Sequence, residues 1–469
     1  MKSVTILTIA AMAMAAATGC SHDTPTPSPE PPVKGGEFNE FGFRTTAPVT
    51  LSVDYGDMAG MPANVYFEVY DTCPVEETET AYAKIAGVEP LYAGYTDGQG
   101  RFEGTIELPA YIRKAYVLTP AFYARTLLEA TRSGDMLTAS AESGAPANAA
   151  PASTRAKEYH STAVERDGWK TWLGSYDTTY GSIGYEYDGD LKVKNYGALL
   201  KAHASVFDTT KKCPKEYRSS RDLYLEKSAE VVITLLGSNT CWNSSMGYYY
   251  YKTGNKPKSL ADANVVMIFP NTQDGRWSNS PWESRLYQGV ERGTAVQLIY
   301  YPEIADGSKA GATTVFPADY RIGFVLATNA WTNRLRAGDK KYRAATSDGL
   351  SVNNNGVAYQ TPRTAVFRYT DKKSGINSVL FSFEDHTNDE NFSDVVFTMT
   401  SNPVDAVTDI SSVDVNDGKK TANVLRGIYA FEDLWPSRGD YDMNDVMVRS
   451  DYEKVFNEKG VFEESFMLK

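Results

Sequence analysis

Histidine and cysteine are scarce in this chain: each occurs four times among 469 residues. The histidines are far apart in the sequence, and no pair has the spacing of an HExxH motif or of a Cys/His zinc site. The chain also lacks a Gly-x-Ser-x-Gly nucleophile motif and a glycine-rich phosphate-binding loop. These absences exclude the common signatures of hydrolases and nucleotide-binding enzymes, and they favour a protein without enzymatic activity.

Basic residues are also few relative to acidic ones. The chain has 47 Lys and Arg residues against 59 Asp and Glu residues, which gives a formal net charge of −12. Nucleic acids and anionic membrane surfaces are bound through basic patches, so this balance disfavours both as partners. An acidic chain is better suited to binding divalent cations.

The chain lacks an apolar run long enough to cross a bilayer, and the apolar stretch at its start is also too short. Lys2 is followed by an Ala-rich apolar stretch and then by Thr18-Gly19-Cys20, which is the order of a secretion signal. Small residues directly before a cysteine resemble the bacterial lipoprotein box. That resemblance implies removal of residues 1–19 and lipidation of Cys20, whereas cleavage by the ordinary signal peptidase is the alternative. We expect a lipid-anchored protein of the cell envelope, at the outer membrane or cell surface, that contacts the membrane through its lipid only.

Composition divides the rest of the chain into domains and linkers. The Pro-rich segment 20–40 is typical of an extended tether, and the Ala-, Pro- and Ser-rich segment 140–165 is typical of a linker. Three domains are expected, at residues 41–139, 166–412 and 413–469. All three contain many short alternating segments and few helical ones, so we predict a mainly β protein.

Residues 41–139 are predicted to form an immunoglobulin-like β-sandwich. Residues 49–53 and 65–70 alternate between apolar and polar side chains, and Thr96-Asp97-Gly98-Gln99-Gly100 between two further strands predicts a hairpin. The pattern resembles the accessory modules that carry T-D-x-x-G-x-F turns in surface proteins. The resemblance implies a spacer without chemistry of its own.

Residues 166–412 are predicted to form a larger, jelly-roll-like β-sandwich. One helix is expected at residues 196–207, with Leu199, Leu200 and Ala204 on one side, and most other segments alternate as strands. Three cysteines remain besides Cys20, so at most one disulfide forms within the chain. Cys213 and Cys241 are the best candidates for it because they are the nearest in sequence.

An acidic motif occurs twice in the last quarter of the chain, at residues 381–397 and 429–448. Each copy runs from an apolar strand into Phe-Glu-Asp, crosses a polar loop, and returns through an Asp into another apolar strand. A pattern that survives a change in loop length indicates a repeated site. Alternation with a period of two on both sides of each loop predicts two hairpins, each with one buried face.

The acidic residues of each copy are expected to crowd at the neck of the hairpin loop. Like charges placed opposite each other on paired strands repel, so a bound cation is expected to neutralise them. Calcium, which takes about six to eight oxygen ligands, fits this set. The alternative is that the same side chains cap the turn by accepting backbone N–H bonds. The predicted ligands are Glu384, Asp385, Asp389, Asn391 and Asp394 in the first copy, and Glu432, Asp433, Asp440, Asp442, Asn444 and Asp445 in the second.

The second copy resembles the signature of the LruC-domain family of bacterial surface proteins. The first resembles a related family of unknown function that commonly precedes the LruC domain, and the upstream segments 229–234, 246–250 and 268–271 are similar in order to that companion. The resemblance implies a β-rich, non-catalytic protein of the cell envelope. The LruC domain normally continues well past its motif, whereas this chain ends at Lys469. Residues 413–469 are therefore expected to be a partial β-domain.

Aromatic residues supply a second candidate site. In the run 248–251, alternate tyrosines are expected on opposite faces of a strand. Tyr248 and Tyr250, beside Trp242 or Trp277, could offer a flat platform for sugar rings. Ordinary strand packing is the favoured interpretation of this run, because tyrosine is common in strands.

The expected function is non-enzymatic: a calcium-stabilised surface lipoprotein for adhesion, or for contact with a glycan, extracellular matrix or surface protein. The main alternative is a structural envelope component without a ligand. A glycoside hydrolase would need a carboxylate pair such as Glu384 and Asp394. A duplicated acidic turn favours structural metal sites over two active sites.

Overall fold

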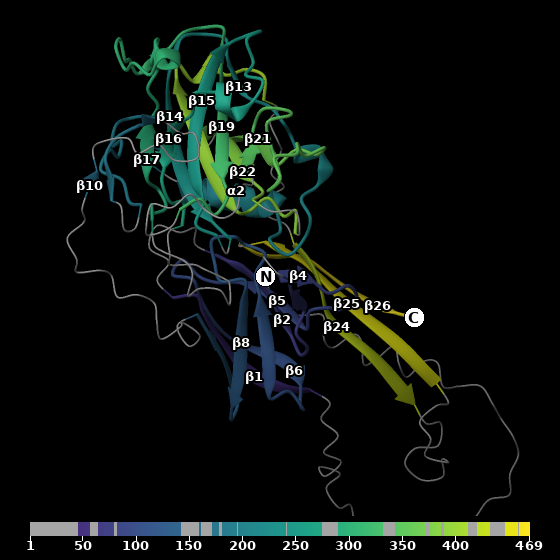
Figure 1. Cartoon of the computed structure of the whole chain (residues 1–469). Helices are drawn as coiled ribbons and strands as arrows, with labels where there is room; N and C mark the ends of the chain where they lie inside the picture. Colours follow the sequence, from purple (N-terminus) through teal and green to yellow (C-terminus); the bar gives the residue numbers. More distant parts are fainter. Residues whose placement is uncertain are drawn as a thin grey trace, which may run out of the picture. The chain divides into compact units, whose positions relative to one another are not determined.

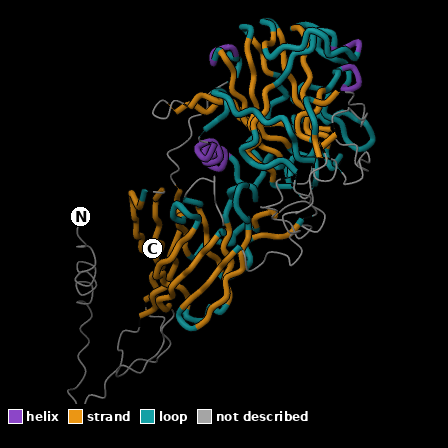
Figure 2. The backbone as a smooth tube through the Cα atoms, turned by 90° about the vertical axis from the view of Figure 1, so that its left-hand side faces the viewer, coloured by secondary structure: helices purple, strands orange, loops and turns teal. Residues whose placement is uncertain are grey.

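Figure 1 shows a computed structural model of the chain. The structure describes residues 46–56, 64–78, 82–141, 159–160, 171–177, 181–194, 196–240, 242–273, 289–331, 343–371, 376–385, 389–410, 420–431, 446–457 and 459–469, with only the backbone of 159–160 and 423–425. Strands dominate these residues, with one α-helix and a few short 3-10 turns (Figure 2). The predicted mainly β fold is confirmed. Among the described residues, no helix has the length and apolar character needed to span a membrane.

The N-terminal domain is built on seven strands, hydrogen-bonded in the order β5-β2-β7-β8-β9-β1-β6. Strand β1 pairs antiparallel with β6 and parallel with β9. Its residues Val49, Leu51 and Val53 are buried while their neighbours are not, as alternation predicts for a sheet with one covered face. The strands are β1 (Thr46–Asp54), β2 (Tyr66–Tyr70), β5 (Tyr92–Tyr95), β6 (Arg101–Pro109), β7 (Lys114–Leu118), β8 (Leu127–Ser133) and β9 (Met136–Ser140), with a separate small ladder of β3 (Val75–Glu77) and β4 (Tyr82–Lys84).

The predicted hairpin at residues 96–100 is wrong. The strands that flank this turn, β5 and β6, lie at opposite ends of the hydrogen-bonded path and do not pair. Instead, the ring of Phe102 in β6 lies 5.1 Å from Phe67 of β2 and 5.8 Å from Tyr92 of β5. The two ends of the sheet therefore pack face to face, and the turn crosses from one layer of the sandwich to the other. Turn chemistry alone does not distinguish a hairpin from such a crossing.

The large domain contains two six-stranded sheets. The first has the order β11-β16-β15-β19-β13, with β20 also paired to β19; the second has the order β17-β14-β23-β22-β21, with β18 also paired to β14. The first sheet contains β11 (Thr171–Trp172), β13 (Leu223–Leu225), β15 (Ser245–Lys252), β16 (Val266–Phe269), β19 (Tyr320–Ala327) and β20 (Arg343–Ala345). The second contains β14 (Ala229–Ser238), β17 (Ala295–Gln297), β18 (Val315–Phe316), β21 (Thr364–Asp371), β22 (Ile376–Phe383) and β23 (Val395–Asn402). A short ladder of β10 (Tyr159–His160) and β12 (Tyr176–Asp177) and the 3-10 turns Lys215–Tyr217, Leu260–Asp262, Ile304–Asp306 and Val404–Ala406 complete the domain.

Aromatic side chains join the two sheets into a sandwich. Phe324 of the first sheet lies 5.3 Å from Phe381 and 4.9 Å from Phe397 of the second, measured between ring centroids. Phe381 and Phe397 face each other in register and stack 4.9 Å apart. All three rings are fully buried. This inner layer holds the hairpin that carries the first acidic motif.

The prediction that this hairpin buries only one face is wrong. From Ser378 to Phe383 every residue of β22 is buried, and so are the first five residues of β23. The helix α2 (Tyr196–Val206) supplies cover on the outer side, where His203 forms a 2.9 Å hydrogen bond with Ser382. This helix was expected at residues 196–207, and the expectation is confirmed. Leu199 and Leu200 are buried in it, as predicted.

The C-terminal residues form a three-stranded antiparallel sheet in the order β24-β25-β26. Its strands are β24 (Lys420–Phe431), β25 (Val446–Asn457) and β26 (Gly460–Leu468). The pairing of Phe431 with Val446 closes β24 and β25 around the second acidic motif. The sheet is long and narrow, as Figure 1 shows.

Candidate metal centre

The first acidic motif forms the hairpin that its sequence predicts. Strands β22 and β23 are antiparallel, and Phe383 pairs with Val395 at their ends. Glu384 therefore leaves one strand at the point where Asp394 enters the other. Because the pair closes the loop, the acidic side chains on both sides are held close together at its neck.

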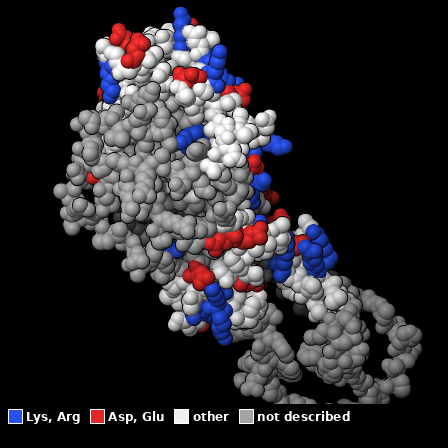
Figure 3. Space-filling model, in the orientation of Figure 1, with Lys and Arg blue, Asp and Glu red and all other residues white. Residues whose placement is uncertain are grey.

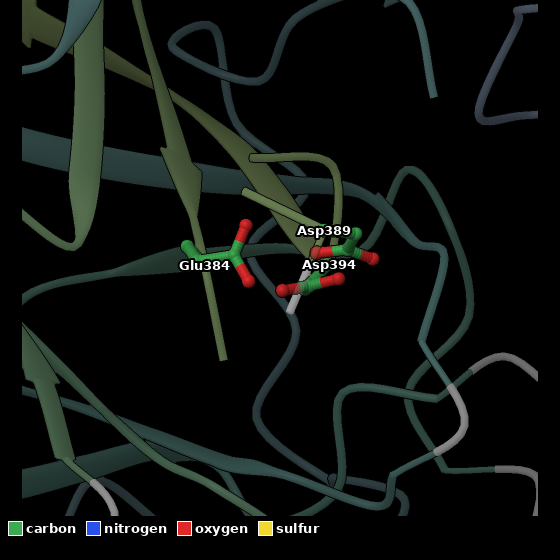
Figure 4. A group of neighbouring side chains, drawn as sticks. All are labelled: Glu384, Asp389 and Asp394. Carbon is green, nitrogen blue, oxygen red and sulfur yellow. The ribbon is translucent and has the colours of Figure 1, made fainter. Parts of the chain in front are cut away.

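Three carboxylates converge at this neck. Glu384, Asp389 and Asp394 each place one oxygen within 4.8 Å of the others, and Figure 4 shows the carboxylate of Glu384 directed towards those of Asp389 and Asp394. Calcium binds oxygen at about 2.4 Å, so two ligands on opposite sides of the ion lie at most about 4.8 Å apart. The spacing of the three oxygens is thus compatible with a single ion between them.

Burial makes this cluster electrostatically unfavourable without a cation. Glu384 is 1% exposed and Asp394 is 3% exposed, while Asp389 is half-buried. Burial and then repulsion from Asp389 raise the pKa of Glu384 well above its usual value. Burial and then repulsion from Asp385 and Glu384 raise the pKa of Asp394 in the same way. Removal of ionised carboxylates from water is costly unless positive charge is supplied nearby.

All five predicted ligands of the first copy contact protein groups, and three of them accept backbone N–H bonds of the loop. The carboxylate of Asp385 accepts a hydrogen bond from the hydroxyl of Thr240, and its backbone N–H donates to Asp394 Oδ2 at 2.6 Å. Asn391 Oδ1 accepts from the backbone N–H of Ser393 at 2.7 Å. Capping of the turn, the alternative to metal binding, therefore describes Asn391 and one oxygen each of Asp394 and Glu384, which accepts from the backbone N–H of Phe392 at 3.2 Å. Glu384, Asp389 and Asp394 remain the candidates for a cation, because they are the carboxylates that converge and each has a second oxygen.

A buried arginine in this cluster was not identified from the sequence. Arg363 Nη2 lies 3.3 Å from Glu384 Oε1, and the side chains of both residues are almost completely buried. The guanidinium also lies 4.9 Å from the centre of the Tyr359 ring, in a cation–π contact. Arg363 precedes β21, whose first residue, Thr364, pairs with Phe383. No local pattern marks this residue, because only the pairing of β21 with β22 brings it to the motif.

Arg363 neutralises only part of the local negative charge. It faces a group of four acidic residues: Glu384, Asp385, Asp389 and Asp394. The next acidic residue, Glu390, has separate cations, since its carboxylate lies 3.2 Å from Lys212 Nζ and 3.4 Å from Arg218 Nη1. When ionised, the inner group therefore holds an excess of negative charge that a divalent ion would largely offset.

The second acidic motif lies outside the described residues. This applies to all six of its predicted ligands: Glu432, Asp433, Asp440, Asp442, Asn444 and Asp445. The strands that flank it are described, and their closing pair, Phe431 with Val446, corresponds to Phe383 with Val395 in the first copy. The prediction of a repeated hairpin is confirmed, whereas the second metal site stays a prediction.

The favoured interpretation of the tyrosine run, ordinary strand packing, is confirmed for Tyr248, and the alternative of an exposed platform is wrong for this residue. This side chain is fully buried, and its hydroxyl donates to the carbonyl of Ile299 at 2.6 Å. Tyr250 is half-buried and donates to the carbonyl of Tyr301 at 2.8 Å. Both rings pack inside the strand layer. The half-buried Trp242 therefore has no exposed tyrosine row beside it in the described structure, and Trp277 lies outside the described residues.

The remaining predicted residues concern cysteine chemistry. Cys213 is a free, buried thiol whose sulfur donates to the carbonyl of Pro214 at 3.3 Å, and Cys241 lies outside the described residues. The structure thus gives no support for a disulfide between them. Cys20, the predicted lipidation site, also lies outside the described residues.

Comparison with known families matches two segments of the chain. Residues 47–141 match a domain of unknown function (DUF8469), and residues 316–402 match another domain of unknown function (DUF4114). The first segment coincides with the N-terminal sandwich, and the second contains the hairpin with the first acidic motif. No match to an LruC domain was found. No curated protein and no solved structure matches the chain significantly.

Proposed function

We propose that this chain is a non-enzymatic, lipid-anchored cell-surface protein whose large sandwich is stabilised by a divalent cation, with calcium as the first candidate. The observation that carries the proposal is the buried excess of carboxylates at the neck of the β22–β23 loop. An ion bound there would join both strands and the loop. It would therefore stiffen one end of the sandwich.

The choice of calcium depends on the chemistry of the available groups. All three convergent ligands are carboxylates, which favour hard cations over zinc or copper. Calcium accepts irregular sets of about six to eight oxygens, whereas magnesium demands near-octahedral geometry at about 2.0–2.1 Å. Water and backbone carbonyls would complete the coordination of an ion held by Glu384, Asp389 and Asp394.

The surface location depends on the sequence of the first 40 residues and on the resemblance of the second motif to the LruC family. Both support a bacterial envelope protein presented on a Pro-rich tether. Adhesion, or contact with a glycan or the matrix, is the proposed role of the stiffened domain. Basic and acidic side chains both occur on the face drawn in Figure 3. The net charge of −12 supports a partner other than nucleic acid.

The geometry favours a structural ion over a glycoside hydrolase. Glu384 and Asp394 are almost completely buried, and Glu384 is also held by Arg363 and by the backbone N–H of Phe392 at 3.2 Å. A sugar chain would have to lie between the two carboxylates for hydrolysis. Turnover of a polysaccharide that Glu384→Gln abolishes would contradict this part of the proposal.

Thermal unfolding in calcium and in EDTA tests the proposal. Calcium should raise the melting temperature of the natural chain, because a ligand that binds only the folded state stabilises it by about 2.7 kcal/mol at a hundredfold excess over its Kd. Asp389→Asn should lose this response. The matched control is Glu390→Gln, which changes the neighbouring carboxylate that faces Lys212 and Arg218. It should keep the response.

Two outcomes would contradict the proposed ion. One is an identical melting temperature in millimolar calcium and in EDTA. The other is an equal calcium response in the Asp389→Asn and Glu390→Gln variants. A glycan array separates recognition from a purely structural role: binding by the calcium-loaded chain supports recognition, and absence of binding to every glycan supports a structural envelope component.

A further inference from the structure

The two faces of the C-terminal sheet differ in chemistry. In paired strands, residues opposite each other in register lie on the same face. Phe431 with Val446, and Tyr429 with Val448, therefore share one face, which also carries Phe466 and Leu468 of β26. We call this the apolar face; it comprises Tyr429, Phe431, Val446, Val448, Phe466 and Leu468.

The opposite face also exposes the apolar side chains of Ile428, Met447 and Met467, but it differs in carrying a cluster of ion pairs. The Asp451 carboxylate forms ion pairs with three basic side chains: Arg449 Nη2 at 3.3 Å, Lys469 Nζ at 3.2 Å and Arg426 Nε at 3.7 Å. Covering this charged face with another protein layer would remove several ionised groups from water, which is costly. Covering the centre of the apolar face would remove no ionised group from water. Its charged pair, Lys454 and Glu464, lies opposite each other in register and away from Phe431 and Val446.

The apolar face is open to solvent at the end next to the motif, whereas at its other end Phe456 is 4% exposed and its ring lies 6.0 Å from Tyr66 and 5.7 Å from Tyr95 of the N-terminal sandwich. Phe431 is 51% exposed, Val446 53% and Phe466 48%. Tyr429 and Leu468 are more than half exposed as well. Contiguous large apolar side chains at a surface mark an interaction site in soluble proteins.

The first copy of the motif shows what kind of layer covers this face. Tyr429 and Phe431 precede Glu432-Asp433 as Phe381 and Phe383 precede Glu384-Asp385. In the first copy both phenylalanines are fully buried, and Phe381 packs against Phe324 of the facing sheet. The residues of this face that lie next to the motif are therefore covered by a second β-sheet in one copy and exposed in the other.

We propose that the apolar face packs against the apolar face of a second copy of this chain, forming a two-layer sandwich about a two-fold axis. A two-fold interface must be self-complementary, and an uncharged apolar patch meets that condition. The axis would pass through the patch, so Lys454 and Glu464 of the two copies would lie at opposite ends and no like charges would meet. This inference does not depend on the proposed function.

The size of the face sets the expected strength of association. Large apolar side chains bury about 150–250 Å² each, and these are about half exposed, so two copies together would bury about 1,000 Å². Specific interfaces begin at about that area. We therefore expect a dimer that dissociates on dilution in the micromolar range, as is usual for a small apolar interface.

Sedimentation of the full chain over a range of concentrations tests the inference, with Cys20→Ala in every sample so that no lipid drives association. The natural face should give a monomer–dimer equilibrium. Phe466→Glu should shift the chain to monomer, with Kd raised at least tenfold. Met467→Glu is the matched control, because Met467 is the next residue, is 52% exposed, and lies on the charged face opposite Asp451.

The outcomes separate clearly. A dimer that Phe466→Glu disrupts and Met467→Glu retains supports the inference. Circular dichroism and an unchanged melting temperature of the large sandwich show that Phe466→Glu has not unfolded the chain, and Tyr429→Lys provides an independent second variant. A chain that is monomeric at every concentration overturns the inference, and so does a dimer that both substitutions weaken equally. Specific capture of a different protein by the monomeric chain would also overturn it.

Discussion

Phe381 and Tyr429 occupy the same position in the two copies of one acidic motif, yet Phe381 is fully buried and Tyr429 is 51% exposed. The flanking strands pair in the same way in both copies. The difference comes from what lies above the sheet: the first hairpin is the centre of a sandwich, and the second belongs to a three-stranded sheet with an open face. One sequence pattern therefore specifies the hairpin but not its cover.

Truncation at the equivalent positions should have the largest effect on this comparison. Phe381→Ala should lower the free energy of unfolding of the large sandwich by about 3–5 kcal/mol, because it leaves a cavity between Phe324 and Phe397. Tyr429→Ala should lower the free energy of unfolding of the monomeric chain by about 0.5 kcal/mol or less. Urea denaturation of both variants measures the difference. Equal losses would show that the two hairpins are packed alike in solution.

Loss of Arg363, the buried positive side chain of the first copy, should have an effect of similar size. Arg363→Ala should destabilise the sandwich by about 3–5 kcal/mol in EDTA, because it leaves buried carboxylates without their resident positive charge. Calcium should restore part of this loss if an ion binds beside Glu384. Lys227→Ala is the control: its pair with Asp405 is exposed, so its loss should cost less than about 1 kcal/mol. A variant lacking Arg363 that is as stable as the natural chain would contradict the electrostatic account of the cluster.

The raised pKa of Asp385 is a consequence of burial of the first motif, so it can be used to test that burial. Burial raises the pKa of this carboxyl to about 7, so between pH about 4 and about 7 the folded chain binds a proton that the unfolded chain has lost. Stability contributed by this group is therefore greatest at low pH and falls as pH rises towards 7. In EDTA, the melting temperature of the natural chain should fall relative to that of Asp385→Asn over this range.

A constant difference in melting temperature between these two proteins from pH 4 to pH 7.5 would contradict the raised pKa. The Thr240 hydroxyl donates to Asp385 in the natural chain, and an asparagine oxygen accepts the same bond. The substitution therefore removes the titrating proton while it retains the contact.

The smallest expected effect concerns the stoichiometry of binding. If both copies bind calcium, titration calorimetry should give two ions per chain. Asp394→Asn should remove one and Asp445→Asn the other. Two sites in the natural chain, each removed by its own substitution, would extend the comparison to function. One site that only Asp394→Asn removes would limit metal binding to the buried copy.

Local patterns predicted the elements and much of the metal centre. The helix at Tyr196–Val206, the strand at Ile376–Phe383 and its partner Val395–Asn402 follow from periodicity, which is set by near neighbours in the chain. The same spacing predicted that Glu384 and Asp394 would meet at the loop neck. Three convergent carboxylates were thus found among five predicted residues of the first copy.

Contacts between distant residues were missed for a common reason. Arg363 reaches Glu384 only because β21 pairs with β22, and the turn at residues 96–100 crosses between layers because β6 pairs with β1. Tyr248 is buried in the core of the large sandwich, where its hydroxyl donates a hydrogen bond to the carbonyl of Ile299, 51 positions away. None of these partners is implied by the residues next to it.

The amino-acid sequence by itself determined where strands and the helix form, and which acidic side chains crowd at a hairpin neck, because alternation and turn chemistry act over a few residues. The tertiary structure alone decided which faces of those strands are covered, which carboxylates converge and which are capped, and which arginine neutralises them. Burial depends on layers contributed by segments far apart in the chain, and the residues of a repeated motif do not specify which layer packs against it.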